Sequence, residues 1–307
     1  MTEPTPWIML GTVGHMVRIA SPEKNVVRTP SKVSTISESI NGTLTEDLRG
    51  VRRSWEIETA YLMADDLSYL EACYSGVMNK ALRLRDPVNK NLLSASTSLG
   101  SKSPALSNGT KNWTPSTGIA GELELDTPEI AYSTPEGRAV SYVTNKAIRW
   151  TTPTAGILYA DCRYEAGNVV LGNMDIPVIP GERLVLSAYI RRISGSGNIT
   201  VRMSFYDADG GYMRGSGFFS TPLTWTRQAA YTTVAAGEAS VIVEFASSAG
   251  GTWDFSHVQL ESLSNLAGTL PTQWIVGAGC PHVIFTDLGQ VSPVYPLVTA
   301  SIKLRER

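Results

Sequence analysis

The C-terminal part of the chain reads as strand-forming sequence that has no nearby partner. The segments Cys280–Phe285 and Tyr295–Leu304 are hydrophobic but too short to enclose a core of their own. Residues 1 to about 90, in turn, read as an open, strand-rich unit that lacks closing strands. We therefore expect the chain to begin one domain, insert a second, and return to complete the first.

The length and a change in composition place the boundary. A chain of 307 residues has room for two domains of ordinary size. Residues 94–117 are dominated by Ser, Thr, Asn, Gly and Lys, which is typical of a linker or loop rather than of a core. We expect residues 1–92 and 264–307 to form the first domain, and residues 93–263 to form the inserted one.

The composition favours an all-β protein and excludes several functions. Hydrophobic residues make up 42% and charged residues 18% of the chain, and its 27 Gly and 17 Pro suit many short strands joined by turns. A net charge of −2 gives no basic field to hold a phosphate backbone, so we expect no nucleic-acid partner. No apolar run approaches the roughly 20 residues of a membrane-spanning helix, so we expect no membrane span.

The cysteines and the N-terminus indicate where the protein is made. Cys73, Cys162 and Cys280 are an odd number without paired spacing, which builds neither a disulfide framework nor a zinc site. The first residues lack the basic start and apolar stretch of a secretion signal. We expect synthesis in a cytoplasm.

The first domain should contain several strands and one helix. Residues 7–10 and 15–19 read as a hairpin, and Asn41-Gly42 is a strong turn signal. Residues 54–62 alternate, which predicts one shared face for Trp55, Ile57, Thr59 and Tyr61. A helix is predicted from Asp65 or Asp66 to Gly76, with an apolar side formed by Leu67, Leu70, Cys73 and Tyr74.

The inserted domain should be a β-sandwich. Seven strand-like segments follow one another with regular turns, and half-buried strands at this spacing need a facing sheet. The segments are 138–144, 147–151, 184–192, 198–206, 227–234, 240–246 and 254–261. Residues 215–217, Gly-Ser-Gly, read as a hairpin turn, because they lack the lysine and helix of a phosphate-binding loop.

No catalytic constellation emerges from the sequence. His15, His257 and His282 lie far apart and none stands beside a plausible nucleophile. The candidate carboxylates for a glycosidase pair are Asp207, Asp209, Glu244, Asp254 and Glu261. Asp207 and Asp209 sit in a predicted turn, where capping or calcium binding suits them better than catalysis. We expect the protein not to be an enzyme.

A series of short motifs in the inserted domain resembles a known family. The motifs are residues 176–182, 186–191, 205–210, 225–227 and 258–261. In this order they resemble galactose-binding-like jelly rolls, the carbohydrate-binding modules of glycosidases and phage tail proteins. The resemblance implies a jelly roll that binds glycans. It also allows a structural calcium ion, for which Asp207, Asp209 and Glu261 are the candidate ligands.

Aromatic rings rimmed by polar groups are what a sugar site requires. Trp225 and Tyr189 match strand positions that pack in the core of such modules, so we exclude them. The remaining candidates for glycan contact are Trp150, Tyr159, Tyr164 and Tyr212.

The flanks of the inserted domain resemble minor or distal tail proteins of long-tailed bacteriophages. The resembling segments are residues 86–87 and 91–93 before the module, and 272–277 and 280–281 after it. The resemblance implies a tail-tube-like β-sandwich or split barrel with one helix, interrupted by the jelly roll. It further implies a virion protein that forms a ring, with six copies favoured, among other tail proteins such as the tube and the hub. Host-surface glycans would be its outward partner. The alternatives are a glycan-binding or glycan-cleaving protein and a secreted adhesin.

Overall fold

The structure is a computed structural model of the chain. It describes residues 7–20, 26–78, 81–94, 97–98, 113–115, 122–124, 148–160, 163–165, 168–170, 176–220, 222–262, 271–277, 279–294 and 297–307. These residues are mainly β-strand, with α1 (Ala64–Tyr74) as the one helix of more than a single turn among them. The predicted fold class, mainly β with one helix, is confirmed.

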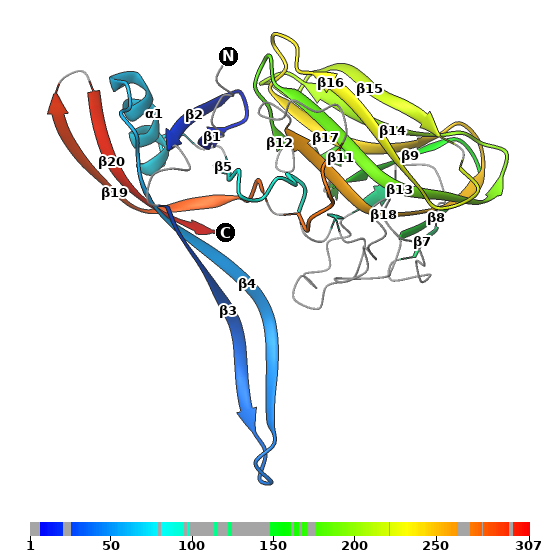
Figure 1. The fold of residues 1–307 in the computed structure, drawn as a ribbon, viewed down its shortest axis with the longest axis horizontal. Coiled ribbons are helices and arrows are strands. Elements are labelled where there is room, and N and C mark those ends of the chain that lie inside the picture. The colour runs from blue at the N-terminus through cyan, green and yellow to red at the C-terminus, as the bar shows by residue number, and fades with distance from the viewer. Residues whose placement is uncertain are drawn as a thin grey trace.

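Two ends of the chain build one unit, and its middle builds another (Figure 1). The first unit has two sheets. Sheet 1, in the order β2-β1-β5, contains β1 (Ile8–Thr12), β2 (His15–Ala20) and β5 (Arg83–Arg85). Sheet 2, in the order β19-β20-β4-β3, contains β3 (Val26–Glu38), β4 (Leu44–Glu58), β19 (Val283–Val294) and β20 (Leu297–Glu306). The C-terminal strands therefore pair with β4, an N-terminal strand.

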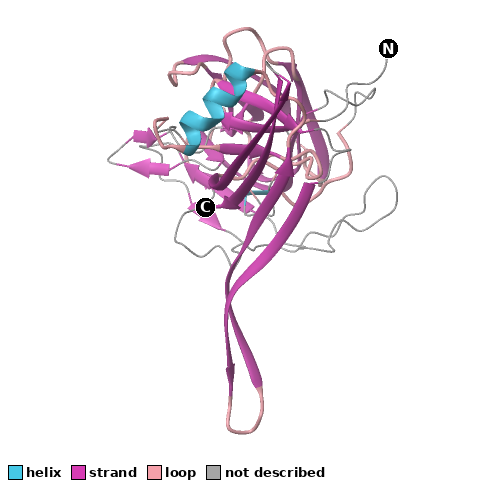
Figure 2. Ribbon diagram, turned by 90° about the vertical axis from the view of Figure 1, so that its left-hand side faces the viewer, coloured by secondary structure: helices cyan, strands magenta, loops and turns pink. Residues whose placement is uncertain are grey.

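The core of the first unit lies where α1 and the two sheets meet (Figure 2). Its fully buried side chains include Ile8, Leu10, Ile19, Trp55, Ile57, Leu70, Leu84, Ile302 and Leu304. The prediction of one buried face for residues 54–62 holds for Trp55, Ile57 and Thr59. It is wrong for Tyr61, which is exposed because β4 ends at Glu58.

The helix begins one residue before the predicted range and buries most of the predicted stripe, but the prediction is wrong for Tyr74, which is 50% exposed at the last position of the helix. Asp65 and Asp66 lie in its first turn, where carboxylates oppose the positive end of the helix dipole. Leu67 and Leu70 are buried, and Cys73 is half-buried against the same core. Gly76 follows the helix with a φ of 77°, the left-handed conformation that glycine adopts without strain.

The hairpin of β3 and β4 extends far beyond the first unit (Figures 1 and 2). β20 pairs with β4 only from Ser54 to Glu58, so residues 29–53 form a two-stranded ribbon, here called the arm. The turn at Asn41-Gly42 closes the hairpin as predicted, with Gly42 at a φ of 80°.

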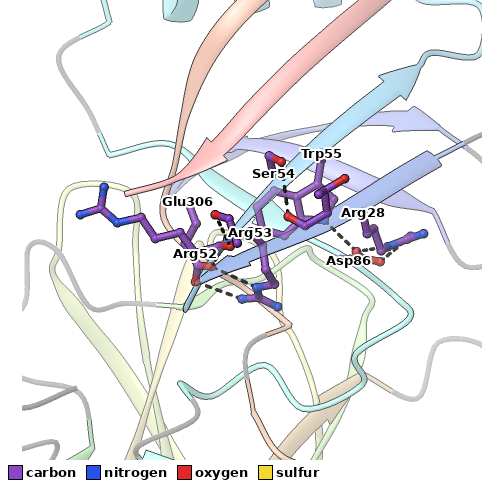
Figure 3. Close-up of polar contacts among 9 residues, drawn as sticks. Arg28, Arg52, Arg53, Ser54, Trp55, Asp86 and Glu306 are labelled. Atoms are coloured by element: carbon purple, nitrogen blue, oxygen red, sulfur yellow. Dashed lines mark hydrogen bonds and ion pairs between the residues drawn. The ribbon is translucent and has the colours of Figure 1, made fainter. Parts of the chain in front are cut away.

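The arm is fixed to the first unit by charged contacts at its base (Figure 3). Asp86 accepts hydrogen bonds from Arg28 Nη2 at 2.8 Å and from Trp55 Nε1 at 3.1 Å. Burial alone would raise the pKa of Asp86, but the Arg28 guanidinium holds it below its usual range. On the neighbouring strand, the Arg53 amide donates to Glu306 at 3.0 Å, and the two side chains form an ion pair.

The second unit is a jelly-roll sandwich of two sheets. Sheet 3, in the order β15-β14-β17-β9-β6 with β12 also paired to β17, contains β6 (Trp113–Pro115), β9 (Gly156–Ala160), β12 (Ile176–Pro177), β14 (Ile199–Tyr206), β15 (Tyr212–Ser220) and β17 (Ser240–Ser247). Sheet 4, in the order β16-β13-β18-β8-β7, contains β7 (Glu122–Glu124), β8 (Ile148–Thr152), β13 (Arg183–Gly195), β16 (Thr226–Thr233) and β18 (Gly251–Ser262). A separate pair joins β10 (Arg163–Glu165) to β11 (Asn168–Val170). Phe205, Phe245 and Phe255 lie in the core between the sheets.

The sandwich contains strands that the sequence analysis did not expect. The predicted strand 138–144 lies outside the described residues. The prediction of a hairpin turn at residues 215–217 is wrong, because Gly215 and Gly217 lie within β15 and pair with Ser204 and Arg202. Glycine removes side-chain contacts from a strand, but the register with β14 supplies the backbone hydrogen bonds.

A buried ion pair joins the two units. Arg85 at the end of β5 donates from Nη1 to Glu182 Oε2 at 2.9 Å, and both side chains are buried. Burial would by itself lower the pKa of Arg85 and raise that of Glu182, but each charge moves the other's pKa in the opposite, charge-favouring direction. Gly14 in the β1–β2 turn adds a close contact, because a Cβ there would lie 2.8 Å from the Ala208 Cβ of the jelly roll.

Candidate functional site

The outer face of sheet 3 gathers aromatic and polar side chains. Along β14, Val201, Met203 and Phe205 point into the core, so Arg202, Ser204 and Tyr206 point outward. Directly opposed residues of antiparallel strands share a face. The register therefore adds Tyr159 of β9, Ile242 and Glu244 of β17, and Gly215 and Gly217 of β15 to the same surface. We call this surface the tyrosine face.

Three tyrosines span the tyrosine face. Tyr206 and Ile242 form a small buried cluster, with Tyr159 packed against it. The rings of Tyr206 and Tyr212 meet edge to face, with centroids 5.7 Å apart. Tyr212 is 59% exposed, whereas Tyr206 is buried. The face thus presents one ring to solvent and supports it with others, the arrangement that stacking on a sugar ring requires.

Polar groups lie between the tyrosines. Arg202 Nε donates to Glu244 Oε2 at 2.7 Å, and Glu244 is 2% exposed. Ser204 lies two residues after Arg202 on the same face of β14. It is fully buried, and its hydroxyl has no hydrogen-bond partner among the described residues. A buried hydroxyl without a partner costs about 1–3 kcal/mol.

Two glycines leave one side of the tyrosine face without side chains. Gly215 and Gly217 are exposed positions of the edge strand β15. A Cβ on Gly215 would lie 2.9 Å from Arg202 Cδ and 3.2 Å from the Tyr212 hydroxyl. The Tyr212 hydroxyl therefore lies over Gly215, beside the Arg202 side chain. A side chain at position 215 would displace one of them.

The four residues predicted for glycan contact have different positions. Tyr159 and Tyr212 belong to the tyrosine face. Trp150 is 1% exposed and packs against Trp253 with ring centroids 5.7 Å apart, so the expectation that it borders a cleft is wrong, because its position in β8 faces the core. Tyr164 lies in β10 opposite Val169, and its side chain is outside the described residues. Of the two aromatics excluded as core, Tyr189 is buried and Trp225 is half-buried.

The three predicted calcium ligands do not gather into one group. Asp207 Oδ1 accepts hydrogen bonds from the amides of Asp209 at 3.0 Å and Gly211 at 2.7 Å, so it caps the β14–β15 turn. Glu261 lies on the other sheet and binds the Thr272 amide and hydroxyl at 2.9 and 2.6 Å. In the part of the chain that is described, no three His, Cys, Asp or Glu residues form a group able to hold a metal ion.

The remaining acidic groups of the sandwich have structural partners. Asp254 binds Arg149 and Arg191, and Glu238 binds Arg214. His257 is buried between Tyr189 and Trp274, and its Nδ1 lies 2.6 Å from the Ser256 hydroxyl. This Ser–His contact is closed off from solvent, since both residues are buried.

The outer face of sheet 4 is partly closed by the segment that leads out of the jelly roll. Thr272 accepts a hydrogen bond from Arg227 at 2.7 Å through its carbonyl, and the Ile275 amide donates to Gln259 at 2.9 Å. Trp274 packs on His257 and donates to Ser98 at 3.1 Å. The middle of sheet 4 is thereby buried, which leaves the tyrosine face as the better candidate for binding.

Tyr206, Ser204 and Arg202 were not predicted as site residues, and Glu244 was considered only as a carboxylate of a glycosidase pair. The signal for the first three was the alternation of residues 199–206, in which apolar side chains occupy every second position. Glu244 gives no such signal, because β17 is buried along almost its whole length. Its place beside Arg202 follows only from the pairing of β14 with β17.

Several solved structures are similar to part of this chain. No protein-family model and no curated protein matches the chain. The enzymatically active domain of tailspike protein 4 from bacteriophage CBA120 aligns at 16% identity and a TM-score of 0.39, over 58% of this chain and 22% of the tailspike. The xylan-binding domain CBM22-1 of Paenibacillus barcinonensis Xyn10C aligns at 16% identity and a TM-score of 0.34, over 57% of this chain and 95% of that domain. A Stig cyclase from Fischerella aligns at 11% identity and a TM-score of 0.37, over 57% and 98%.

These identities and TM-scores are low, so the function is argued from the side chains of this protein. Among the described residues, no helix has the length and apolar character to cross a membrane.

Proposed function

We propose that the protein is a structural subunit of a bacteriophage tail tip. In this proposal the first unit assembles with further copies into a ring around the tail axis, for which the resemblance favours six copies. The jelly roll is held on the outside, where it meets the host surface. The protein does no chemistry in this role. Tube and hub proteins would contact the two sides of the ring.

The arm carries this proposal. Even-numbered residues of β3 share a face with Trp55, whose side chain lies in the core of the first unit. That face continues along the arm and includes Ile36 of β3. On β4 it includes Val51, which pairs with Lys32, and Leu44, which pairs with Glu38. Ile36 and Leu44 are each 67% exposed. The core-facing side of the sheet therefore continues as an uncovered strip in which Ile36, Val51 and Leu44 lie opposite the charged residues Glu46, Lys32 and Glu38.

An isolated two-stranded ribbon is only marginally stable in water, and an uncovered apolar strip marks a contact surface. A second copy of the chain is the partner that explains a strip continuous with the domain's own core. A head-to-tail contact of this kind closes into a ring when the rotation between copies fits.

The free edges of sheet 2 contribute less than the arm's face. β3 and β19 are its edge strands, and edge strands pair readily with other chains. Pro30, however, lies in β3 and has no amide hydrogen. The Arg53 amide opposite it points away from β3 and toward Glu306, so the missing donor falls on the outer edge. A proline on an edge limits strand addition there.

Light scattering and negative-stain imaging of the purified protein test the proposal. We expect rings for the full chain. We expect monomers for a variant in which an Asn-Gly turn joins Lys32 directly to Val51, which are partners in the hairpin. A full-length protein that remains monomeric at high concentration, or rings that persist without the arm, would refute this role.

The tyrosine face supports a second function, glycan binding by the jelly roll. Its exposed Tyr212 ring and its glycine-lined side suit a neutral sugar chain lying across sheet 3. We expect binding to host-surface polysaccharide in a pull-down assay, and its loss in Tyr212→Ala together with Gly215→Val. Binding that survives both changes would place the site elsewhere.

A glycan-cleaving enzyme is the alternative that a simple assay separates. Glu261 and Asp207 each bind backbone amides in the structure, which suits support rather than proton transfer. Release of reducing ends from host cell walls by the wild type, abolished in Glu261→Gln or Asp207→Asn, would replace the structural role with a catalytic one.

A further inference from the structure

One end of the outer face of sheet 4 carries a charged cluster that the tyrosine face does not use. Arg191, Asp254 and Arg149 are neighbours across β13, β18 and β8. Asp254 is fully buried and accepts hydrogen bonds from Arg149 Nε at 2.8 Å and from Arg191 Nη2 at 2.6 Å. Trp225 precedes β16 and completes the row, because Arg191 lies 4.9 Å over its ring.

Arg191 is held rigidly but is poorly satisfied. A guanidinium has five N–H donors. In the described structure Arg191 donates through Nη2 alone, and its buried Nε has no hydrogen-bond partner. The Arg191 side chain is 26% exposed, so a ligand that supplies acceptors to its exposed edge makes hydrogen bonds that the protein alone does not make. Arg149 donates to the same carboxylate through Nε and Nη2, which leaves Arg191 as the arginine to assign to a ligand.

The surroundings define the chemistry of that ligand. A planar guanidinium fixed by a carboxylate and an aromatic ring presents its free edge to a second carboxylate. Trp225 is half-buried, and the adjacent Ile193 and Leu223 are 44% and 68% exposed. Thr151 and Thr252 lie two residues along β8 and β18 from Arg149 and Asp254, on the same face of the sheet. Their hydroxyls are 3.2 Å apart. A small anionic group on a ring with one apolar side and several hydroxyls matches this set.

We propose that Arg191 and Trp225 form a second site, which binds an acidic sugar residue through its carboxylate. The choice of a sugar as carrier of the carboxylate rests on the proposed glycan-binding function, but the site lies on the opposite sheet from the tyrosine face. A jelly roll with both sites binds an acidic polysaccharide at Arg191 and a neutral one at the tyrosines.

A nucleic acid fits this cluster less well. Binding of a phosphate backbone draws its affinity from several phosphates neutralised in a row. The cluster offers one under-used guanidinium, on a chain with a net charge of −2. Recognition of a single carboxylate needs no more than that.

Isothermal titration with trigalacturonic acid and with its methyl ester tests the proposal. The two ligands differ only in the carboxylate charge, so we expect the acid to bind and the ester to bind at least about tenfold more weakly. Arg191→Gln should abolish binding of the acid. Arg191→Lys keeps a positive charge beside Asp254 but loses the planar guanidinium. This variant should fold normally, and its affinity for the acid should be at least about fivefold lower.

Two matched variants separate this site from the others. Arg183→Gln removes another arginine of β13 that lies over an aromatic ring, Tyr231, and should leave binding unchanged. Tyr212→Ala should also leave it unchanged, so the tyrosine face and this site fail or succeed independently. The proposal is overturned if the acid does not bind, if the ester binds equally well, or if a thymidine decamer binds more tightly than the acid. It is also overturned if Arg191→Lys has no effect on binding or if Arg183→Gln abolishes it.

Discussion

The arm and the tyrosine face are both sheet surfaces outside the two main cores, and their chemistry differs. The arm presents exposed aliphatic side chains, Ile36, Leu44 and Val51, among charged residues on one side, and mainly Ser and Thr on the other. The tyrosine face presents aromatic rings, an Arg–Glu pair and a buried hydroxyl. Aliphatic surface has no directional partner and is covered by other protein, whereas rings with hydroxyls and charges suit a polar ligand.

The difference supports our proposal that the first unit assembles with other copies and that the jelly roll binds a ligand. The buried Arg85–Glu182 pair and the close approach of Gly14 to Ala208 join them. A module attached at both chain ends and sealed by a buried ion pair keeps a fixed orientation on its support, unlike one that hangs from a single linker.

Charging the aliphatic side of the arm should have the largest effect. Ile36→Lys with Leu44→Lys places two charges in the proposed contact, so we expect assembly to be lost, with no change in the melting temperature of the monomer. Sedimentation velocity measures the species present. Thr35→Lys with Thr45→Lys puts the same charges on the other side of the same hairpin and should leave assembly intact. Equal effects of both pairs would show that the arm has no functional side.

Breaking the junction pair should strongly reduce the free energy of unfolding. Arg85→Met leaves Glu182 as a buried charge without its partner, which destabilises a protein by about 3–5 kcal/mol. Urea unfolding followed by tryptophan fluorescence measures the change. The double variant Arg85→Met/Glu182→Met removes both charges and should recover most of the loss. A double variant as unstable as the single one would argue that packing rather than charge governs the junction.

The same pair gives the junction a pH dependence. The pKa of Glu182 is lowered in the folded protein despite its burial. Its contribution is therefore complete above the unfolded carboxyl pKa, about 4.3, and is lost as the pH falls through the lower folded value. Acid unfolding of the wild type should begin below about pH 4, and the double variant should shift this onset downward.

Two aromatic residues that the sequence analysis grouped together should behave differently. Trp150→Ala empties a core position and should cost about 3–5 kcal/mol of unfolding free energy. Tyr212→Ala removes an exposed ring and should leave stability within about 0.5 kcal/mol, while weakening glycan binding. Thermal unfolding and a glycan pull-down, run on both variants, separate packing from recognition. A stable Trp150→Ala variant that loses binding would reverse this assignment.

The fold class and the local elements could be predicted from the sequence more accurately than the face of the jelly roll on which each side chain lies. The Asn41-Gly42 turn and the stripe of Leu67 and Leu70 are local signals, and the structure confirms both. β15 was missed because Gly215 and Gly217 are turn-forming residues on their own, and only pairing with β14 makes them a strand. The arm's length was not foreseen, since alternation in a sequence does not reveal whether a partner sheet stops partway along.

The candidate site was less predictable for a physical reason. Tyr159 and Tyr212 were selected by residue type, as was Trp150, yet only the pairing of strands decides which rings share a face. β8 belongs to sheet 4, and Trp150 lies opposite Trp253 with its ring inward. Arg202 and Glu244 are 42 residues apart in the chain and become neighbours through one register. Such contacts require the topology, which no local pattern encodes.

An ion pair on the arm should have the smallest effect and sharpens the contrast with the junction. Lys32 Nζ lies 3.2 Å from Glu46, and both side chains are exposed. The hydrogen bond from Lys32, followed by one from Ser34, lowers the pKa of Glu46. Lys32→Ala should therefore raise the Glu46 pKa toward its ordinary value in an NMR titration, without a measurable change in unfolding. Exposed pairs of this kind contribute little, because water screens them and the long side chains lose entropy when they are fixed. A clear loss of arm order in this variant would mean that the hairpin depends on its own charges, and its aliphatic side would then need no second copy to cover it.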